Sequence, residues 1–211
     1  MIGRGGVLLL LASATLGAQG GTLPPLTSWS DQTHYYVKNA FDAGSLLIPA
    51  LPAAIVMLDP PSHYPHEWKN GGAAFGRNFG DALATELAAK TGKYVAAGSF
   101  REDPRYFRST DRGAWKRLGH AVGFTFVDRS VHGDRMLAVS NIAGAFAGGF
   151  AGRAYLPEGY DDRTHALQRT SGTYFGYAPT LLVGYMTGNI AEEFKPELKR
   201  VAKALHIPFV K

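Results

Sequence analysis

The stretch GAAFGRNFGDALATELAAKTGKYVA, residues 72–96, decides the fold predicted for this chain. It places a small residue at every fourth position: Gly72, Gly76, Gly80, Ala84, Ala88, Gly92 and Ala96. On an α-helix, residues four apart lie one above the other, so these positions form a slowly winding stripe with almost no side-chain bulk. Such stripes let two helix backbones approach closely. We therefore predict a helix here that packs tightly against another helix.

The same spacing recurs in two later segments. One contains Ser140, Gly144, Gly148 and Gly152, and the other contains Gly172, Gly176, Thr180, Gly184 and Gly188. A glycine inside a helix costs about 1 kcal/mol relative to alanine, so this many are tolerated only where close interhelical contact compensates. The three stripes predict an all-α fold, a compact bundle of about five to six helices. Leucine at Gly148 should force the helices apart, and alanine there should be much milder.

Polar residues lie beside or within these stripes. An amide or an ion pair in a helix interface hydrogen-bonds to the neighbouring helix and specifies its register. We expect this structural use for Arg77, Asn78, Asp81, Asn141 and Asn189.

The N-terminus has the layout of a secretory signal peptide. Arg4 supplies a positive start, residues 7–16 are apolar, and small residues near Ala18 allow cleavage. We predict a signal peptide at 1–18, an extended lead-in rich in Gly, Pro, Ser and Thr at 19–33, and one helical domain at 34–211. Export places the protein in the cell envelope, either the periplasm or the outer membrane, and argues against nucleic acid as a partner.

The composition excludes several classes of chemistry. The chain has no Cys, so it has no disulfide framework, thiolate metal site or cysteine nucleophile. No nucleophile elbow, phosphate loop or dinucleotide fingerprint occurs, and no cofactor is expected. The net charge of +5 is compatible with anionic lipid head groups.

The sequence leaves two relations to the membrane open. Residues 171–191 are uncharged and long enough to cross a bilayer, and the shorter run 136–152 is also uncharged. Both runs are rich in Gly, Ala and Thr rather than Leu, so a membrane-embedded bundle and a water-soluble one remain alternatives. The charged, aromatic segment 101–108 is expected to form a surface connection between helices. A basic amphipathic helix is predicted near the C-terminus, with Phe194, Leu198, Val201 and Leu205 opposite Lys195, Lys199, Arg200 and Lys203.

Two polar clusters are weak candidates for a site. His63, His66 and Glu67 form a ligand set that suits zinc, with His34 or His165 as further ligands, although the spacing differs from that of a metalloprotease helix. The cluster of Glu158, Asp161, Asp162 and His165 could hold a cation or act in acid–base catalysis. Helix capping by Asp162 and surface exposure ahead of a helix explain both clusters more simply, so no catalytic residue and no metal site is assigned.

Four short motifs resemble a family of exported, Gly-rich helical bacterial proteins of unknown function. They are HEW (66–68), FGRNFG (75–80), EDPRY (102–106) and SNIAGAF (140–146). The resemblance covers roughly residues 39–198, and it implies export and the extent of the domain. No activity is assigned in that family, so it implies no catalytic residue.

These observations predict a non-enzymatic, membrane-associated envelope protein that acts through interaction or assembly. Membrane lipid, another envelope protein or a second copy of the chain would be its partner. Two alternatives stay open: a metal-dependent hydrolase or metal-binding protein that uses His63, His66 and Glu67, and an outer-membrane β-barrel. The barrel is suggested by local alternation at 124–127, whereas the longest patterns repeat at four residues rather than two.

Overall fold

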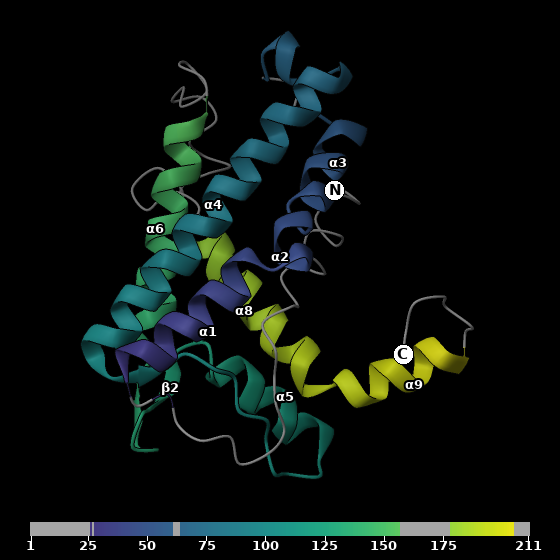
Figure 1. Cartoon of the computed structure of the whole chain (residues 1–211). Helices are drawn as coiled ribbons and strands as arrows, with labels where there is room; N and C mark the ends of the chain where they lie inside the picture. The colour runs from purple at the N-terminus through teal and green to yellow at the C-terminus, as the bar shows by residue number, and fades with distance from the viewer. Residues whose placement is uncertain (1–25, 27, 61–63, 157–177, 205–211) are drawn as a thin grey trace.

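The computed structural model describes residues 26, 28–60, 64–156 and 178–204. Figure 1 shows that this part of the chain is mostly helical, which confirms the predicted all-α bundle. In chain order the helices are α1 (Trp29–Phe41), α2 (Ala43–Leu47), α3 (Ala50–Leu58), the 3-10 helix His66–Trp68, α4 (Gly71–Phe100), α5 (Ala114–Gly123), α6 (Val139–Tyr155), α8 (Ala178–Glu193) and α9 (Lys195–Ala204). The predicted signal peptide, residues 1–18, lies outside the described residues.

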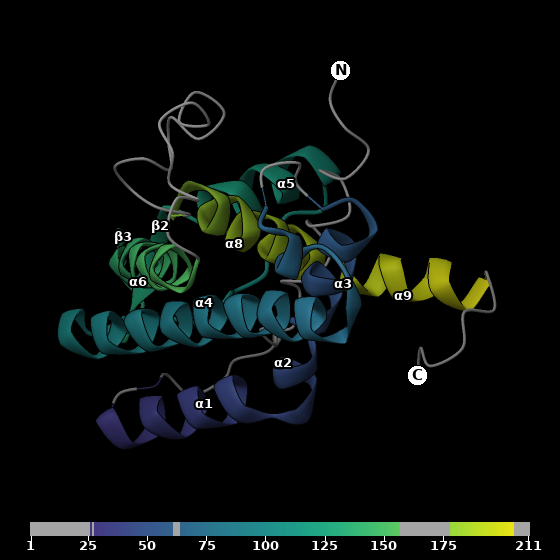
Figure 2. The same cartoon turned by 90° about the horizontal axis from the view of Figure 1, so that it is seen from above.

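The long helix α4 packs along α6, and glycine brings the two backbones together (Figures 1 and 2). A Cβ atom built on Gly92 would lie 2.6 Å from the Ala147 Cβ and 3.0 Å from the Ala143 carbonyl oxygen. On the other helix, a Cβ on Gly144 would lie 2.7 Å from the Ala89 carbonyl oxygen. Neither helix has room for a side chain at these points.

Only some of the small residues of α4 lie at this contact with α6, which we call the seam. Among the described residues, a Cβ on Gly72 or Gly76 would meet nothing within 4 Å, so these two glycines do not lie in the contact with α6. The reason is helical geometry: each step of four residues turns by about 40°, so Gly72 lies about 200° around the helix from Gly92. Gly80 lies against the ring of Tyr155, the last residue of α6, so it does belong to the contact between the two helices. Ala84 and Ala88 are half-buried, while Thr85 and Ala89 supply the atoms that face Gly148.

The stripe of small residues on α6 is shorter than the one on α4, so it turns through a smaller angle around its helix. Ser140, Gly144, Gly148 and Gly152 are all buried. Helix α8 packs on the same helix and against α5, and it carries Gly184 and Gly188, which are half-buried. Gly172 and Gly176 lie outside the described residues.

The N-terminal helices begin earlier than the composition indicated. Ser28 and Asp31 form a capping box in which the Ser28 hydroxyl accepts from the Asp31 N–H at 3.0 Å, so α1 starts inside the expected lead-in 19–33. The helical stretch before α4 is interrupted: Asp42 caps α2, and Pro49 precedes α3. The chain therefore bends twice before α4.

A small antiparallel sheet closes one end of the bundle. It contains β1 (Glu102–Asp103), β2 (Val127–Ser130) and β3 (Arg135–Leu137) in that order. Gly133, at φ 93°, allows the tight turn between β2 and β3. The expectation that 101–108 lies at the surface was wrong, since residues 102–106 are buried. Their charges are paired inside the fold, as described below.

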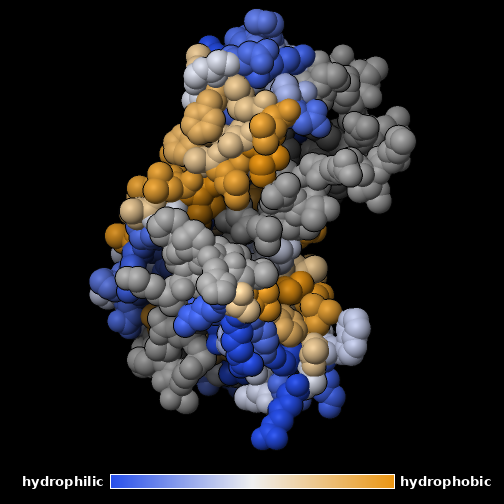
Figure 3. Space-filling model, turned by 90° about the vertical axis from the view of Figure 1, so that its right-hand side faces the viewer, coloured by the Kyte–Doolittle hydropathy of each residue, from blue (hydrophilic) through white to orange (hydrophobic). Residues whose placement is uncertain are grey.

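Helix α3 leaves an apolar surface exposed. Its sequence ALPAAIVML contains no charged residue, and only Ala53 is buried. Leu47, Leu51 and Leu58 are 68%, 44% and 86% exposed. Figure 3 shows a broad apolar area at the height of α3 in Figure 1, with mostly polar side chains below it. We call Leu51 and Leu58 of α3, together with Leu47 at the end of the preceding helix α2, the α3 surface.

The seam can be tested with alanine at two glycines. A Cβ on Gly148 would lie 2.8 Å from the Thr85 carbonyl oxygen and 2.8 Å from the Ala89 Cβ. We therefore expect Gly148→Ala to cost about 1–3 kcal/mol through overpacking, which corrects the expectation of a mild effect. Gly76→Ala, at the open position on α4, should stabilise by up to about 1 kcal/mol. Chemical denaturation of both variants measures the change in the free energy of unfolding. Equal changes would contradict tight packing at Gly148.

Candidate functional site

Buried charged side chains gather where the end of α4 meets the sheet and the start of α6. Glu102, Asp103, Asp128 and Arg105 are 0%, 2%, 2% and 7% exposed. Lys93 projects into the same region from α4. Charges are rarely buried unless they are paired, so this cluster is the most unusual chemical feature of the described residues.

Glu102 caps helix α6. Its carboxylate accepts hydrogen bonds from the Ser140 N–H at 2.9 Å and from the Ser140 hydroxyl. A carboxylate at a helix N-terminus satisfies an unpaired N–H group and interacts favourably with the helix dipole. Arg101 makes this possible, because its left-handed backbone (φ 54°, ψ 41°) ends α4 and redirects the chain inward.

Asp103 and Arg105 pair side by side. The Arg105 Nε donates to Asp103 Oδ1 at 2.7 Å, and its Nη2 donates to Oδ2. The guanidinium also lies over the Phe107 ring, 5.6 Å from its centroid. Hydrogen bonding to Asp103 raises the Arg105 pKa above its ordinary value. This bidentate ion pair explains how residues 102–106 can be buried.

Lys93 is a half-buried cation between α4 and α6. Its Nζ donates to Asn141 Oδ1 at 2.8 Å, and the Asn141 amide donates to the Thr125 carbonyl at 3.0 Å. Burial lowers the pKa of Lys93, while the nearby carboxylates Asp128, Glu102 and Asp103 oppose this effect. Burial also raises the pKa of Asp128 well above its usual range, against the opposing effect of Lys93. The interior therefore favours the neutral form of Asp128.

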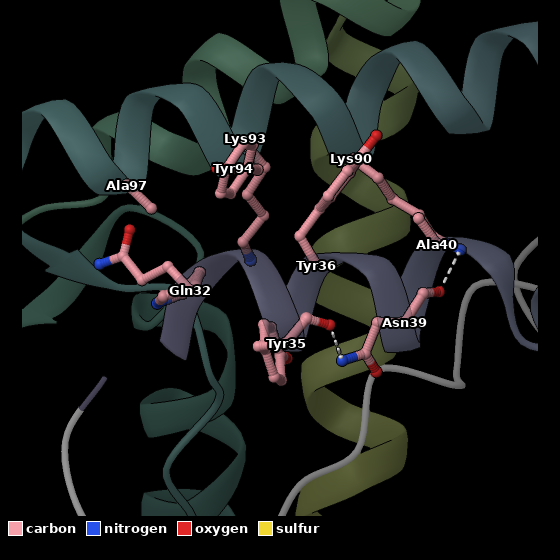
Figure 4. Close-up of a pocket in the computed structure, with 10 residues that line it drawn as sticks. Gln32, Tyr35, Tyr36, Asn39, Ala40, Lys90, Lys93, Tyr94 and Ala97 are labelled. Atoms are coloured by element: carbon pink, nitrogen blue, oxygen red, sulfur yellow. Dashed lines mark hydrogen bonds between the residues drawn. The ribbon is translucent and has the colours of Figure 1, made fainter. Parts of the chain in front are cut away.

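Two small cavities border Lys93. The first is a cleft between α1 and α4 with Tyr35, Tyr36 and Tyr94 on its walls, and Figure 4 shows Lys93 reaching from α4 toward α1. The second lies toward α8 and includes Asp128 and Asn189. Each has about 30 Å³ of free volume, enough for about two water molecules. The arrangement leaves room for water beside Lys93.

Two buried polar atoms near these cavities lack a hydrogen-bond partner among the described residues. They are Gln32 Oε1, beside the first cavity, and the Tyr185 hydroxyl, in a side chain that lines the second. The Lys93 ammonium lies over the Tyr185 ring, 5.4 Å from its centroid. Burial raises the pKa of Tyr185. Both atoms are suitable partners for buried water.

A second group of charges holds the segment after β1 against the end of α8. The Glu193 carboxylate accepts from the Tyr106 hydroxyl at 2.7 Å, the Ser109 N–H at 2.9 Å and Arg117 Nε at 2.8 Å. Arg117 also donates to Glu197 at 2.6 Å. We call Tyr106, Glu193, Arg117 and Glu197 the Glu193 clamp, and it fastens α5, α8 and α9 together.

Of the residues in the two predicted polar clusters, only His66 and Glu67 lie in the described part of the chain. His66 and Glu67 are exposed on the 3-10 helix, where the Glu67 carbonyl accepts from Arg77 at 2.7 Å. Within the described ranges, no group of three His, Asp or Glu side chains is arranged to hold a metal ion. Five of the candidates lie outside the described residues: His63, Glu158, Asp161, Asp162 and His165.

The expected polar contacts between elements are observed at three asparagines. Asn78 donates to the Trp68 carbonyl at 3.0 Å, and Asn141 and Asn189 both donate to groups at the end of α5. Sequence reasoning missed the Lys93 and Glu102 cluster. The usable signal was a lysine directly after Gly92 in the seam, where a charged side chain must enter the helix interface.

No protein-family model matches the chain, and no characterised protein or solved structure does either. The site is therefore interpreted from its own geometry.

Asp128 should reduce stability as pH rises. A carboxyl whose folded pKa is raised loses its proton more readily in the unfolded chain, so stability declines once pH exceeds the unfolded value of about 3.9. Asp128→Asn should flatten this decline between about pH 4 and 7. Urea denaturation across that range measures the slope. Asp134→Asn, in the exposed turn of the same hairpin, is the control and should leave the slope unchanged.

Glu193 should act in the opposite direction. Burial raises its pKa, but hydrogen bonds from Arg117, Tyr106 and Ser109 outweigh this, so the folded pKa is lowered. Its stabilisation is present above the unfolded value of about 4.3 and is lost as pH falls through the folded pKa.

Two substitutions, Glu193→Gln and Glu197→Gln, are compared to test the Glu193 clamp. Both carboxylates bind Arg117, but their side chains are 1% and 43% exposed. We expect Glu193→Gln to cost about 2–3 kcal/mol at pH 7, because three hydrogen bonds to a charged group weaken. Glu197→Gln should cost no more than about 1 kcal/mol. If denaturation curves give equal losses, burial does not determine the strength of the clamp.

Proposed function

We propose that this chain is a non-enzymatic protein of the cell envelope that binds a lipid bilayer through the α3 surface. The observation that carries the proposal is the exposure of an uninterrupted apolar helix: eight of the nine residues of α3 are not buried. Exposed apolar surface of this kind, next to polar surface, is typical of a protein or membrane interaction site. Lipid is the partner favoured here, and another envelope protein or a second copy is the alternative outcome.

The length of the apolar region suits an interfacial location. No single described helix is long and apolar enough to cross a bilayer, whereas Trp29–Phe41 together with Ala43–Leu58, bent by 44°, passes by length and composition. A short helix with satisfied internal hydrogen bonds can lie in the head-group and acyl boundary without crossing it. Transfer of one exposed leucine into an apolar environment contributes about 1.5–3 kcal/mol. The α3 surface offers three leucines.

Two further observations support an envelope role without catalysis. The N-terminal layout of Arg4 followed by an apolar run is that of an exported chain. In addition, Glu102, Arg105 and Glu193 direct their hydrogen bonds to groups within the fold. This pattern favours a structural use of the buried charges.

The test is flotation of the purified chain with phosphatidylcholine vesicles. The parent should float with the lipid, and Leu58→Asp should lower the partition coefficient at least about tenfold, because a leucine transfer is replaced by a charge. Leu137→Asp is the matched control, since Leu137 is 58% exposed on β3 and lies outside the α3 surface. Circular dichroism establishes that both variants are folded.

Absence of flotation by the parent, or equal losses in the two variants, would contradict lipid binding through α3. Concentration-dependent self-association that Leu58→Asp abolishes, without flotation, would assign the α3 surface to a second copy instead.

A further inference from the structure

Helix α9 extends away from the body of the molecule, as Figures 1 and 2 both show. Its sequence KPELKRVAKA carries four basic residues and one acidic residue. Lys199, Arg200 and Lys203 are exposed, and so are the apolar side chains Leu198 (53%) and Val201 (56%). The helix therefore presents a basic face and an apolar face to its surroundings.

The two faces are arranged along the helix for an interface. At about 100° per residue, Lys199, Lys203 and Arg200 lie on one face of the helix, and Leu198 and Val201 lie on the opposite face. The cations of such a helix complement anionic head groups, and its apolar side chains can enter the boundary between head groups and acyl chains.

The Glu193 clamp fixes where this helix begins. Arg117 joins Glu193 and Glu197, and its guanidinium lies over the Phe194 ring, 4.5 Å from the centroid. Lys195 pairs with Glu192 at 3.0 Å. These contacts involve the first turn of α9, and Lys199, Arg200 and Lys203 follow them. The protein thus holds the basic face at a defined position relative to the bundle.

Helix α3 lies on the right-hand side of Figure 1, and α9 projects toward the same side in Figures 1 and 2. A lipid surface on that side would meet the outer half of α9, which carries Arg200 and Lys203. Anionic phospholipid complements that charge, and each Lys or Arg near an anionic surface strengthens binding about fivefold.

We propose that α9 is a second membrane contact that selects anionic phospholipids. This inference rests on the proposed lipid binding through α3 and adds the lipid class. Helix α3 supplies affinity for any bilayer, and α9 supplies the preference for negative charge.

The experiment compares vesicles of pure phosphatidylcholine with vesicles that contain phosphatidylglycerol, using the full chain. The parent should bind the anionic vesicles at least tenfold more tightly, and added salt should reduce this preference. The double variant Lys199→Glu/Lys203→Glu should lose the preference and keep its binding to pure phosphatidylcholine. The control double variant Lys38→Glu/Arg135→Glu changes the net charge equally at exposed positions on α1 and β3 and should keep the preference.

The outcomes separate the two proposals. Equal binding of the parent to both vesicles, or equal losses in the two double variants, would overturn the role of α9 and leave α3 binding intact. Tight binding to anionic vesicles that Leu58→Asp does not weaken would overturn the α3 proposal and support α9 alone. Failure of the parent to bind either vesicle would overturn both.

Discussion

The contact between α4 and α6 at distances that exclude a side chain is the constraint on which the rest of the structure depends. Gly92, Gly144 and Gly148 allow the two backbones to meet, and they fix the register of one helix along the other. Lys93 follows Gly92 directly, so the same approach delivers its ammonium to Asn141 on α6. The buried polar cluster is therefore a consequence of the seam, and it also specifies the seam, because a shifted register would separate lysine from amide.

The buried charges have separate structural uses. Glu102 caps α6, Arg105 holds Asp103, and Glu193 ties the segment after β1 to α8. Removing charges from water costs several kcal/mol per ion, and hydrogen bonds of good geometry must offset that cost. Lys93 and Asp128 are less completely compensated, which is why their pKa values are shifted toward the neutral forms. The buried charged side chains near the sheet therefore specify how the helices are positioned more clearly than they raise the free energy of unfolding.

The helical class and the α6 stripe could be predicted from residue spacing, because four positions in a row turn by only about 120° around a helix. Over the full length of α4 the same spacing fails, since the accumulated rotation carries Gly72 and Gly76 away from the seam. The burial of 102–106 could not be predicted either, because charged residues are placed at the surface unless their partners are known. Asp103 and Arg105 are close in sequence, but Glu102 and Ser140 are far apart in it.

The candidate sites were less predictable than the fold. Asn141 and Asn189 were recognised as contacts between elements from their places within the stripes. Lys93 and Asp128 carried no motif, and their environment depends on several segments that meet only in the folded chain. The α3 surface presented a different difficulty: the apolar composition of 50–58 was evident, but an apolar helix reads as buried until its neighbours are known.

The glycine seam also affects how stability varies with temperature. A contact built from Gly and Ala removes little apolar surface from water for each residue that it orders, and the heat capacity change of unfolding grows with that surface. The α4–α6 contact should therefore contribute less heat capacity per residue than a seam of leucines. A small heat capacity change flattens the stability curve, so cold weakens such an interface less than one held together by large apolar side chains.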